Sequence, residues 1–128
     1  RKKVIDQLAA VLILESYFYL TESGKSPVED FIKSLDSPTR RKFYYVKNLL
    51  ETFGHRLLYP HAKYIGNEIF ELRFQGQEGH IRMLYFFFSE NMVIFTNGFI
   101  KKSNKTPVNE KQTAIDRRMD YLQRSNKK

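Results

Sequence analysis

Cysteine is absent from the sequence, which excludes a disulfide framework and any metal site built on thiolate ligands. The three histidines do not have the spacing of a metal site, so we expect neither a metal nor another cofactor. The chain also lacks a glycine-rich phosphate-binding loop and a Gly-x-Ser-x-Gly motif, which argues against P-loop, dinucleotide-binding and serine hydrolase enzymes. A chain without cysteine is compatible with a reducing compartment, and we expect a cytoplasmic protein.

Long hydrophobic runs are absent as well. The run that ends at Leu14 is broken by Glu15 and is far too short to span a bilayer, so we expect no membrane partner. No small-residue cleavage site typical of a secretory signal follows it. The first residue is Arg1 instead of methionine, and we therefore expect the chain to begin inside a longer gene product.

Positive charge and aromatic residues are abundant. The 22 lysines and arginines outnumber the 14 acidic residues, which gives a net charge of +8. The 11 phenylalanines and 8 tyrosines contribute to a 41% apolar composition, which is enough for a hydrophobic core and argues against a disordered chain. The charge favours a polyanionic partner such as a nucleic acid, and an acidic protein partner would satisfy the same electrostatics.

The length of 128 residues fits one domain, which we assign to residues 1–128 with residues 1–11 as an N-terminal extension. Residues 1–10 are compatible with a short helix or an extended segment. Runs of β-forming residues predict strands at residues 12–20, 69–74, 80–89 and 92–101. Residues 55–67 are predicted to form a loop, and residues 75–79 a hairpin loop.

Three segments carry residues typical of a helix start. Two lie between the first and second predicted strands, and the third follows the last strand. They are Ser26-Pro27 with Glu29 as a capping box, Ser37-Pro38, and Thr106-Pro107. The second helix carries an apolar stripe of Phe43, Val46, Leu49, Leu50 and Phe53, and the third a stripe of Val108, Ile115, Met119 and Leu122. The order strand, helix, helix, three meandering strands and helix predicts a compact α+β domain with helices on an antiparallel-type sheet.

Alternation along the strands gathers charged side chains on one face of this sheet. In the first hairpin strand, Glu71 and Arg73 share a face that is opposite to the face of Leu72. Arg82 lies within an apolar run of the next strand, where a charge needs a partner or a groove. Lys63, Lys101, Lys102 and Lys105 lie in segments next to these strands. A carboxylate, two arginines and several lysines can thus converge on one face.

Such a set fits RNA cleavage through the 2′-hydroxyl group of the RNA. That reaction needs a base for the hydroxyl, cations for the charge on phosphorus and an acid for the 5′-oxygen. Glu71 is the candidate base, Arg73 and Arg82 are candidate phosphate ligands, and Lys101 or Lys102 can add charge or donate the proton. Candidate residues for binding the RNA chain are Lys63, Tyr64, Tyr85, Lys101 and Lys105.

Ordinary structural roles explain the same residues and stay open. Glu71 with Arg73 or Arg82 can be a cross-strand ion pair. The lysines from Lys101 onward can form a solvated strand end. Tyrosines in a sheet more often belong to its core or its rim.

Four segments resemble a known family in order and spacing. They are residues 24–31 (Gly-Lys-Ser-Pro-Val-Glu-Asp-Phe), residues 71–73 (Glu-Leu-Arg), residues 82–86 (Arg-Met-Leu-Tyr-Phe) and residues 99–107 (Phe-Ile-Lys-Lys-Ser-Asn-Lys-Thr-Pro), followed by Glu110, Ala114 and Arg117. Together they resemble the phage-derived, HigB-like branch of the RelE/HigB superfamily of toxins. The resemblance covers about residues 15–124.

The resemblance implies a toxin of a type II toxin–antitoxin system that acts as an mRNA interferase. Such an enzyme is an endoribonuclease that cuts messenger RNA on the ribosome without a metal ion, with RNA on the concave face of the sheet. It also implies a cognate, HigA-like antitoxin, usually with a helix-turn-helix. By position, Arg73, Arg82 and Lys102 match basic site residues of the superfamily. Glu71 stands where the best-known RelE-type enzymes have a lysine base, and the C-terminal tyrosine of some relatives has no clear counterpart.

Two other functions fit the same scaffold, because one fold can support several activities. The first is a non-cleaving inhibitor like the ParE branch, which targets DNA gyrase. The second is a nucleic-acid-binding regulator. The Glu71, Arg73, Arg82 and Lys102 set favours the endoribonuclease.

Overall fold

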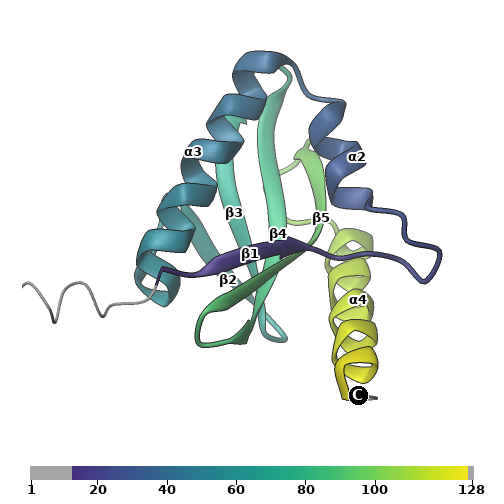
Figure 1. Ribbon diagram of the computed structural model, residues 1–128. Coiled ribbons are helices and arrows are strands. Elements are labelled where there is room, and N and C mark those ends of the chain that lie inside the picture. Colours follow the sequence, from purple (N-terminus) through teal and green to yellow (C-terminus); the bar gives the residue numbers. More distant parts are fainter. Residues whose placement is uncertain (1–12, 127–128) are drawn as a thin grey trace, which may run out of the picture.

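The computed structural model describes residues 13–126, which form a five-stranded sheet, three α-helices and a short 3-10 helix (Figure 1). In chain order the elements are β1 (Glu15–Phe18), α2 (Pro27–Lys33), α3 (Ser37–Phe53), the 3-10 helix η1 (Gly54–Arg56), β2 (Ala62–Gly66), β3 (Ile69–Gly76), β4 (Gly79–Ser89), β5 (Met92–Lys101) and α4 (Val108–Asn126). The predicted α+β class is confirmed. The predicted extension at residues 1–11 lies outside the described residues. None of the helices within the described part is long and apolar enough to cross a membrane.

The strands are ordered β1-β5-β4-β3-β2 in the sheet. The meander β2–β3–β4–β5 is antiparallel throughout, as predicted for β3, β4 and β5, whereas β1 pairs with β5 in parallel. A parallel pair requires a long crossover, and the helices α2 and α3 lie between β1 and the meander in the chain. The predicted first strand at residues 12–20 is shorter in the structure, where β1 covers Glu15–Phe18.

The loop predicted at residues 55–67 is wrong in its last third, where β2 forms an edge strand. The turn from β2 to β3 contains Asn67 and Glu68, whose φ angles of 56° and 66° are left-handed. Such a turn matches the twist of the two strands that it joins and therefore fixes a tight hairpin. The strand is only five residues long and lies between Pro60 and the turn at Gly66, two residues typical of loops, which is why its sequence looked like a loop.

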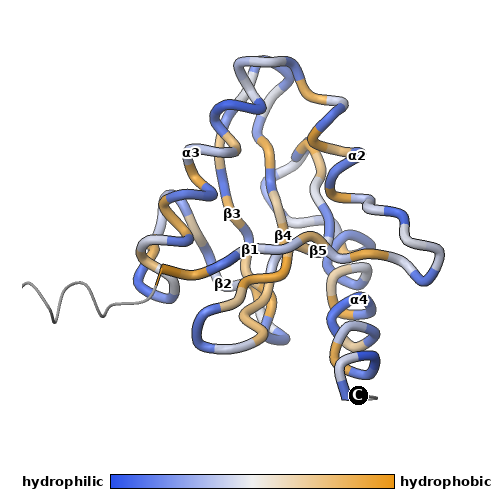
Figure 2. The backbone as a smooth tube through the Cα atoms, in the orientation of Figure 1, coloured by the Kyte–Doolittle hydropathy of each residue, from blue (hydrophilic) through white to orange (hydrophobic). Residues whose placement is uncertain are grey.

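Each face of the sheet packs against different helices. Val28 and Ile32 of α2 and Phe43, Val46 and Leu50 of α3 pack on one face, which we call the helix face. The ring of Phe43 contacts the rings of Phe18, Phe74 and Phe95 at centroid distances of 5.7 to 6.4 Å. Figure 2 shows hydrophobic residues gathered along the central strands, whereas the turns at the rim are hydrophilic. Phe53, the last residue of the predicted α3 stripe, is 44% exposed.

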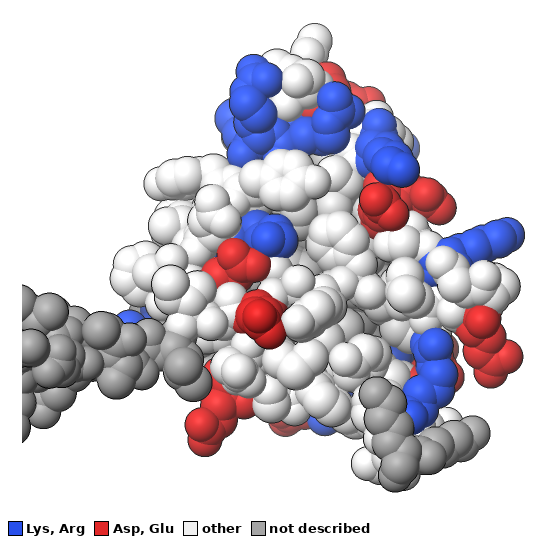
Figure 3. All heavy atoms as spheres, in the orientation of Figure 1, with Lys and Arg blue, Asp and Glu red and all other residues white. Residues whose placement is uncertain are grey.

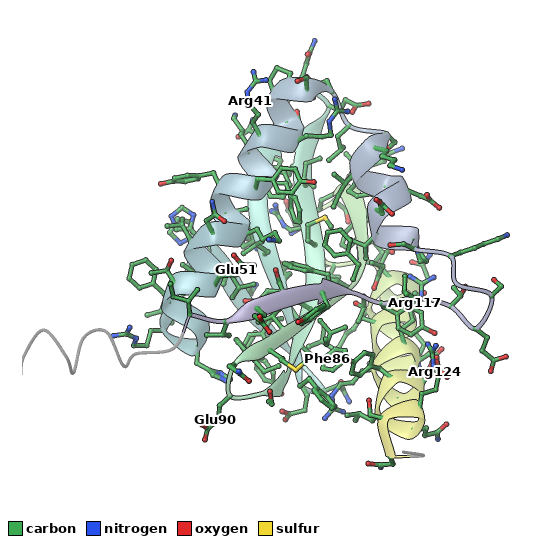
Figure 4. All side chains as sticks on the ribbon, in the orientation of Figure 1. Arg41, Glu51, Phe86, Glu90, Arg117 and Arg124 are labelled. Carbon is green, nitrogen blue, oxygen red and sulfur yellow. The ribbon has the colours of Figure 1, made fainter. Side chains whose placement is uncertain are left out.

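The helix α4 covers only part of the opposite face. Ala114 packs there with Ile69, Leu84 and other apolar residues of the strands. The predicted apolar stripe of α4 is wrong at Val108 and Met119, which are 84% and 49% exposed. Polar groups make much of this contact instead. The guanidinium of Arg117, which Figure 4 labels, donates to the Thr96 carbonyl at 2.9 Å. Asn97 Nδ2 donates to Glu110 at 2.9 Å.

Gly98 on β5 lies under α2, and an added methyl group has no space there. A Cβ atom on Gly98 would lie 2.5 Å from Sδ of Met83 and 2.7 Å from a ring carbon of Phe31. Gly98→Ala should therefore lower the free energy of unfolding by about 1–3 kcal/mol, as overpacking does in other cores. Urea unfolding followed by circular dichroism measures this change. An unchanged midpoint would mean that α2 moves away from the sheet without loss.

Candidate functional site

Strand alternation gathers charged side chains where α4 leaves its face of the sheet uncovered. We call this uncovered area the open face. Arg73 on β3 lies opposite Arg82 on β4, and His80 on β4 lies opposite Lys101 on β5. Paired residues in antiparallel strands project to the same side, so these four side chains share the open face with Glu71. Leu72 packs in the core of the helix face, as the alternation predicts.

Glu71 connects the two arginines. Its Oε1 atom accepts a hydrogen bond from Arg73 Nη1 at 2.6 Å and lies 3.6 Å from Arg82 Nε. Its Oε2 atom accepts a hydrogen bond from the Thr106 hydroxyl at 2.7 Å. Only 1% of Glu71 is exposed. The ion pair left open as a structural role is therefore present, and both carboxylate oxygens already have partners.

Arg82 is a buried cation with unused hydrogen-bonding capacity. It is 5% exposed, and its Nη1 atom donates to the Ile81 carbonyl at 3.0 Å. Within the described part of the chain, its Nε atom has no hydrogen-bond partner. Burial and the neighbouring positive charge of Arg73 lower the pKa of Arg82, while Glu71 opposes this effect. Two arginines face one carboxylate here, so an anion bound beside Arg82 would meet uncompensated positive charge.

Both the backbone and the side chain of Arg73 are held by contacts. Its backbone NH donates to the His61 carbonyl at 2.8 Å. Its guanidinium carbon lies 4.9 Å from the ring centre of Tyr59, in cation–π geometry. Together with the Glu71 contact, these interactions fix the direction of the Arg73 side chain.

A hollow of about 410 Å³ opens above the arginines, and we call it the cationic hollow. It is lined by Arg73, His80, Arg82, Lys101, Lys102, Ser103 and Asn104. Burial, then the charge of Arg82, lowers the pKa of Lys101, and Arg73 and Lys63 act in the same direction. Lys102 lines the hollow but is itself exposed. The hollow thus combines several cations with two side chains that can exchange protons.

The predicted RNA-binding residues do not all meet at this hollow. Lys63 lies opposite Glu71 on β2 and is exposed. Lys105 lies in the exposed loop after β5 and is outside the lining of the hollow, which fits a solvated strand end. Tyr64 packs against Phe70 with ring centres 4.9 Å apart and so belongs to the helix face.

Tyr85 is also placed away from the hollow. It is 1% exposed and lies in the core of the helix face, where burial raises its pKa. Its ring stacks on Phe70 at 5.5 Å and contacts Phe95 at 5.7 Å. The Tyr85 ring is therefore not available to an RNA base, and Tyr85 is not part of the site.

Sequence reasoning missed three residues that the structure adds. They are His80 in the lining of the hollow, Tyr59 against Arg73, and Thr106 as a donor to Glu71. His80 was detectable, because it lies two positions before Arg82 on the same strand and so shares its face. Tyr59 and Thr106 lie outside the strands, where alternation gives no information. Among residues 13–126, no group of three or more His, Asp or Glu side chains is suited to hold a metal ion.

Comparison with known protein families matches residues 30–119 to the family described as phage-derived protein Gp49-like (DUF891). The matched segment includes β3, β4 and β5 and every residue that lines the cationic hollow. No curated protein matches the chain significantly.

The Glu71 carboxylate should be required for stability. Glu71→Gln removes the charge and leaves two buried or half-buried guanidinium groups facing each other, so the free energy of unfolding should decrease by about 3 kcal/mol. Urea unfolding measures the change. Glu29→Gln is a matched control, because Glu29 pairs with Lys33 at the surface and should contribute no more than about 0.5 kcal/mol. Equal stability of both variants would contradict this role of Glu71.

Proposed function

The chain belongs to the phage-derived Gp49-like family, a RelE/HigB-like toxin family of toxin–antitoxin systems, and from this membership we propose that it is a ribosome-dependent mRNA endonuclease. The observation that carries the proposal is the buried Arg82, which lines a hollow together with Arg73, Lys101 and Lys102. This arrangement suits the phosphodiester group of RNA. The partner of such a toxin is an antitoxin, and we propose a HigA-like protein and a cytoplasmic location.

Arg73 and Arg82 are proposed to bind the scissile phosphate. A planar guanidinium presents paired donors to phosphate oxygens, and these donors gain strength as negative charge develops in the transition state. The two side chains are already oriented by Glu71 and Tyr59, so little reorganisation is needed when RNA binds. Lys102 adds positive charge at the open rim of the hollow.

His80 and Lys101 are proposed to move the protons. His80 accepts the proton of the 2′-hydroxyl, whose oxygen attacks phosphorus and forms a 2′,3′-cyclic phosphate. The bond from phosphorus to the 5′-oxygen breaks, and Lys101 gives its proton to the departing oxygen. A lowered pKa makes Lys101 a stronger acid than an ordinary lysine, and its place opposite His80 puts the two groups in one hollow.

Glu71 is proposed to position the arginines instead of acting as the general base. Both of its oxygens accept hydrogen bonds, and it is too buried to reach a hydroxyl of bound RNA. This assignment replaces the base role that the sequence favoured. It explains how a carboxylate can stand beside a phosphate site, since its charge allows two arginines to approach each other.

The ribosome is proposed to place the RNA in the hollow. An open surface of this kind has few groups that can hold a flexible strand in an in-line geometry, so external positioning supplies part of the rate. The antitoxin is proposed to cover the open face with an acidic segment, because the net charge of +8 and the lysines from Lys101 to Lys105 attract acidic partners.

Loss of Arg82 should abolish the activity without unfolding the protein. Induction of the wild-type chain in cells should arrest growth and produce new mRNA 5′ ends within translated frames. Arg82→Ala should lower cutting about a hundred-fold or more, as expected for removal of one preorganised charge-stabilising donor. Arg82→Lys should restore only part of it, because an ammonium lacks the planar fork.

Two controls make this experiment specific. Arg56→Ala removes an exposed arginine of η1 outside the hollow and should leave cutting unchanged. Purified protein should cut mRNA on translating ribosomes but not naked mRNA. A folded Arg82→Ala protein that remains fully toxic would remove Arg82 from the site. Growth arrest without mRNA cuts would favour the gyrase-type inhibitor or the regulator.

The pH dependence of cutting should identify Lys101 as the acid. Because burial and Arg82 lower the pKa of Lys101, the ammonium loses its proton at a lower pH than an ordinary lysine, and kcat/KM should fall on the alkaline side. Lys101→Arg should react more slowly overall but shift this alkaline fall to higher pH, because a guanidinium keeps its proton. Single-turnover cutting on programmed ribosomes measures the profile. Lys105→Arg is the control, and an alkaline limb unchanged in Lys101→Arg would assign the fall to another group.

A further inference from the structure

A second hollow adjoins the cationic hollow and has a different chemistry. It has a volume of about 440 Å³ and lies between α3 and the β3–β4 hairpin. Tyr45 and Val46 of α3 line it together with Pro60 and Phe74, so much of its wall is apolar. We call it the base pocket. Tyr45 is 62% exposed even though it contributes to this wall, which leaves ring surface free for a ligand.

The two hollows meet at shared residues. Arg73, His80 and Arg82 line both of them. A phosphate bound by the two arginines therefore lies at the junction, with the lysines on one side and the apolar wall on the other. A chemical group attached to that phosphate can therefore reach the base pocket.

A further cation, Lys42, belongs to the lining of the base pocket. Lys42 lines it and donates to the Gln75 carbonyl at 3.0 Å, which holds its ammonium at the rim. Figure 3 shows basic side chains gathered at the end of the molecule where α2 meets α3, and Figure 4 labels Arg41 at that end. The lining of the base pocket thus combines an aromatic, apolar wall with the cations Lys42, Arg73 and Arg82.

We propose that the base pocket holds one unpaired nucleobase of the RNA strand whose phosphate is bound by Arg73 and Arg82, with the base against the ring of Tyr45. This inference rests on the proposed function, since it takes RNA as the ligand. A single strand carries flat aromatic bases next to its phosphates, and the two hollows place an aromatic wall next to cations. An acidic peptide would match the cations but would leave the apolar wall unfilled.

Fluorescence of a modified RNA tests the proposal. The probe is a ribotetranucleotide that carries 2-aminopurine at one position in turn and 2′-O-methyl groups that block cleavage. Stacking on a tyrosine should quench 2-aminopurine at one position only. Tyr45→Ala should remove that quenching and weaken binding about ten-fold, as expected for loss of one base–aromatic stack. Tyr44→Ala is the matched control, because Tyr44 is the next residue on α3, is 48% exposed and does not line the pocket.

An abasic nucleotide at the quenched position separates stacking from other roles of Tyr45. If Tyr45 binds the base, removing the base should weaken wild-type binding, and Tyr45→Ala should have no further effect on the abasic RNA. Equal weakening of both RNAs by Tyr45→Ala would assign Tyr45 to the RNA backbone or to stability and overturn the proposal. Wild-type affinity of Tyr45→Ala, or no binding of the probe by the wild type, would overturn it as well.

The outcomes also separate this inference from the proposed function. Coupling between Tyr45 and one base, without any mRNA cutting in cells, would keep the base pocket and refute the nuclease. Cutting that is unchanged in Tyr45→Ala, together with unchanged probe binding, would keep the nuclease and refute the pocket. If Tyr45→Ala weakened binding of an acidic antitoxin segment but not of RNA, the pocket would belong to the protein interface, and the proposal would fail.

Discussion

The structure depends on one buried carboxylate between two arginines. Arg73 and Arg82 lie opposite each other on neighbouring strands, and like charges in that position repel. Glu71 lies two residues before Arg73 on β3 and contacts both guanidinium groups. The register of the hairpin that brings Arg82 to this carboxylate therefore also determines the charge balance of the open face. Its second oxygen holds Thr106, which leads into α4. The same carboxylate therefore connects the centre of the sheet to the helix that limits the open face.

The ion pairs of Glu71 neutralise only one of the two guanidinium charges. The remaining positive charge is what can bind an anion. One carboxylate cannot satisfy the donors of two guanidinium groups, and the Nε of Arg82 has no hydrogen-bond partner among the described residues. A fully paired cluster would be more stable but would not attract a further anion. Folding thus orients and partly desolvates the cations before any ligand arrives, and this preorganisation is what strengthens electrostatic binding in a transition state.

Much of the fold and of the charged cluster could be predicted from the sequence, because strand alternation and helix start signals are local patterns. Alternation along β3 separated Glu71 and Arg73 from Leu72, and helix start signals located α2 and α3. Tyr85 shows how chemistry misled the prediction, because it is an odd number of residues from Arg82 and alternation already assigns it to the helix face. The face of α4 could be predicted only in part: Ile115 of the predicted stripe packs on the strands, whereas polar contacts of Arg117 and Glu110 make up much of the rest. Tyr59 and Thr106 reach the site from loops, whose path depends on the whole fold.

The sheet can hold these charges because its two faces have different roles. The helix face contains the Phe43 cluster and most of the buried aromatic area, so stability is concentrated there. On the other face, β4 is apolar at Leu84 and Phe86, where α4 covers it, and charged at Arg82, just beyond that cover. The position at which α4 begins therefore sets the boundary between the buried core and the open face. Because the loop between β5 and α4 also supplies part of the lining of the cationic hollow, changes in that loop can alter the site while the packed face stays the same.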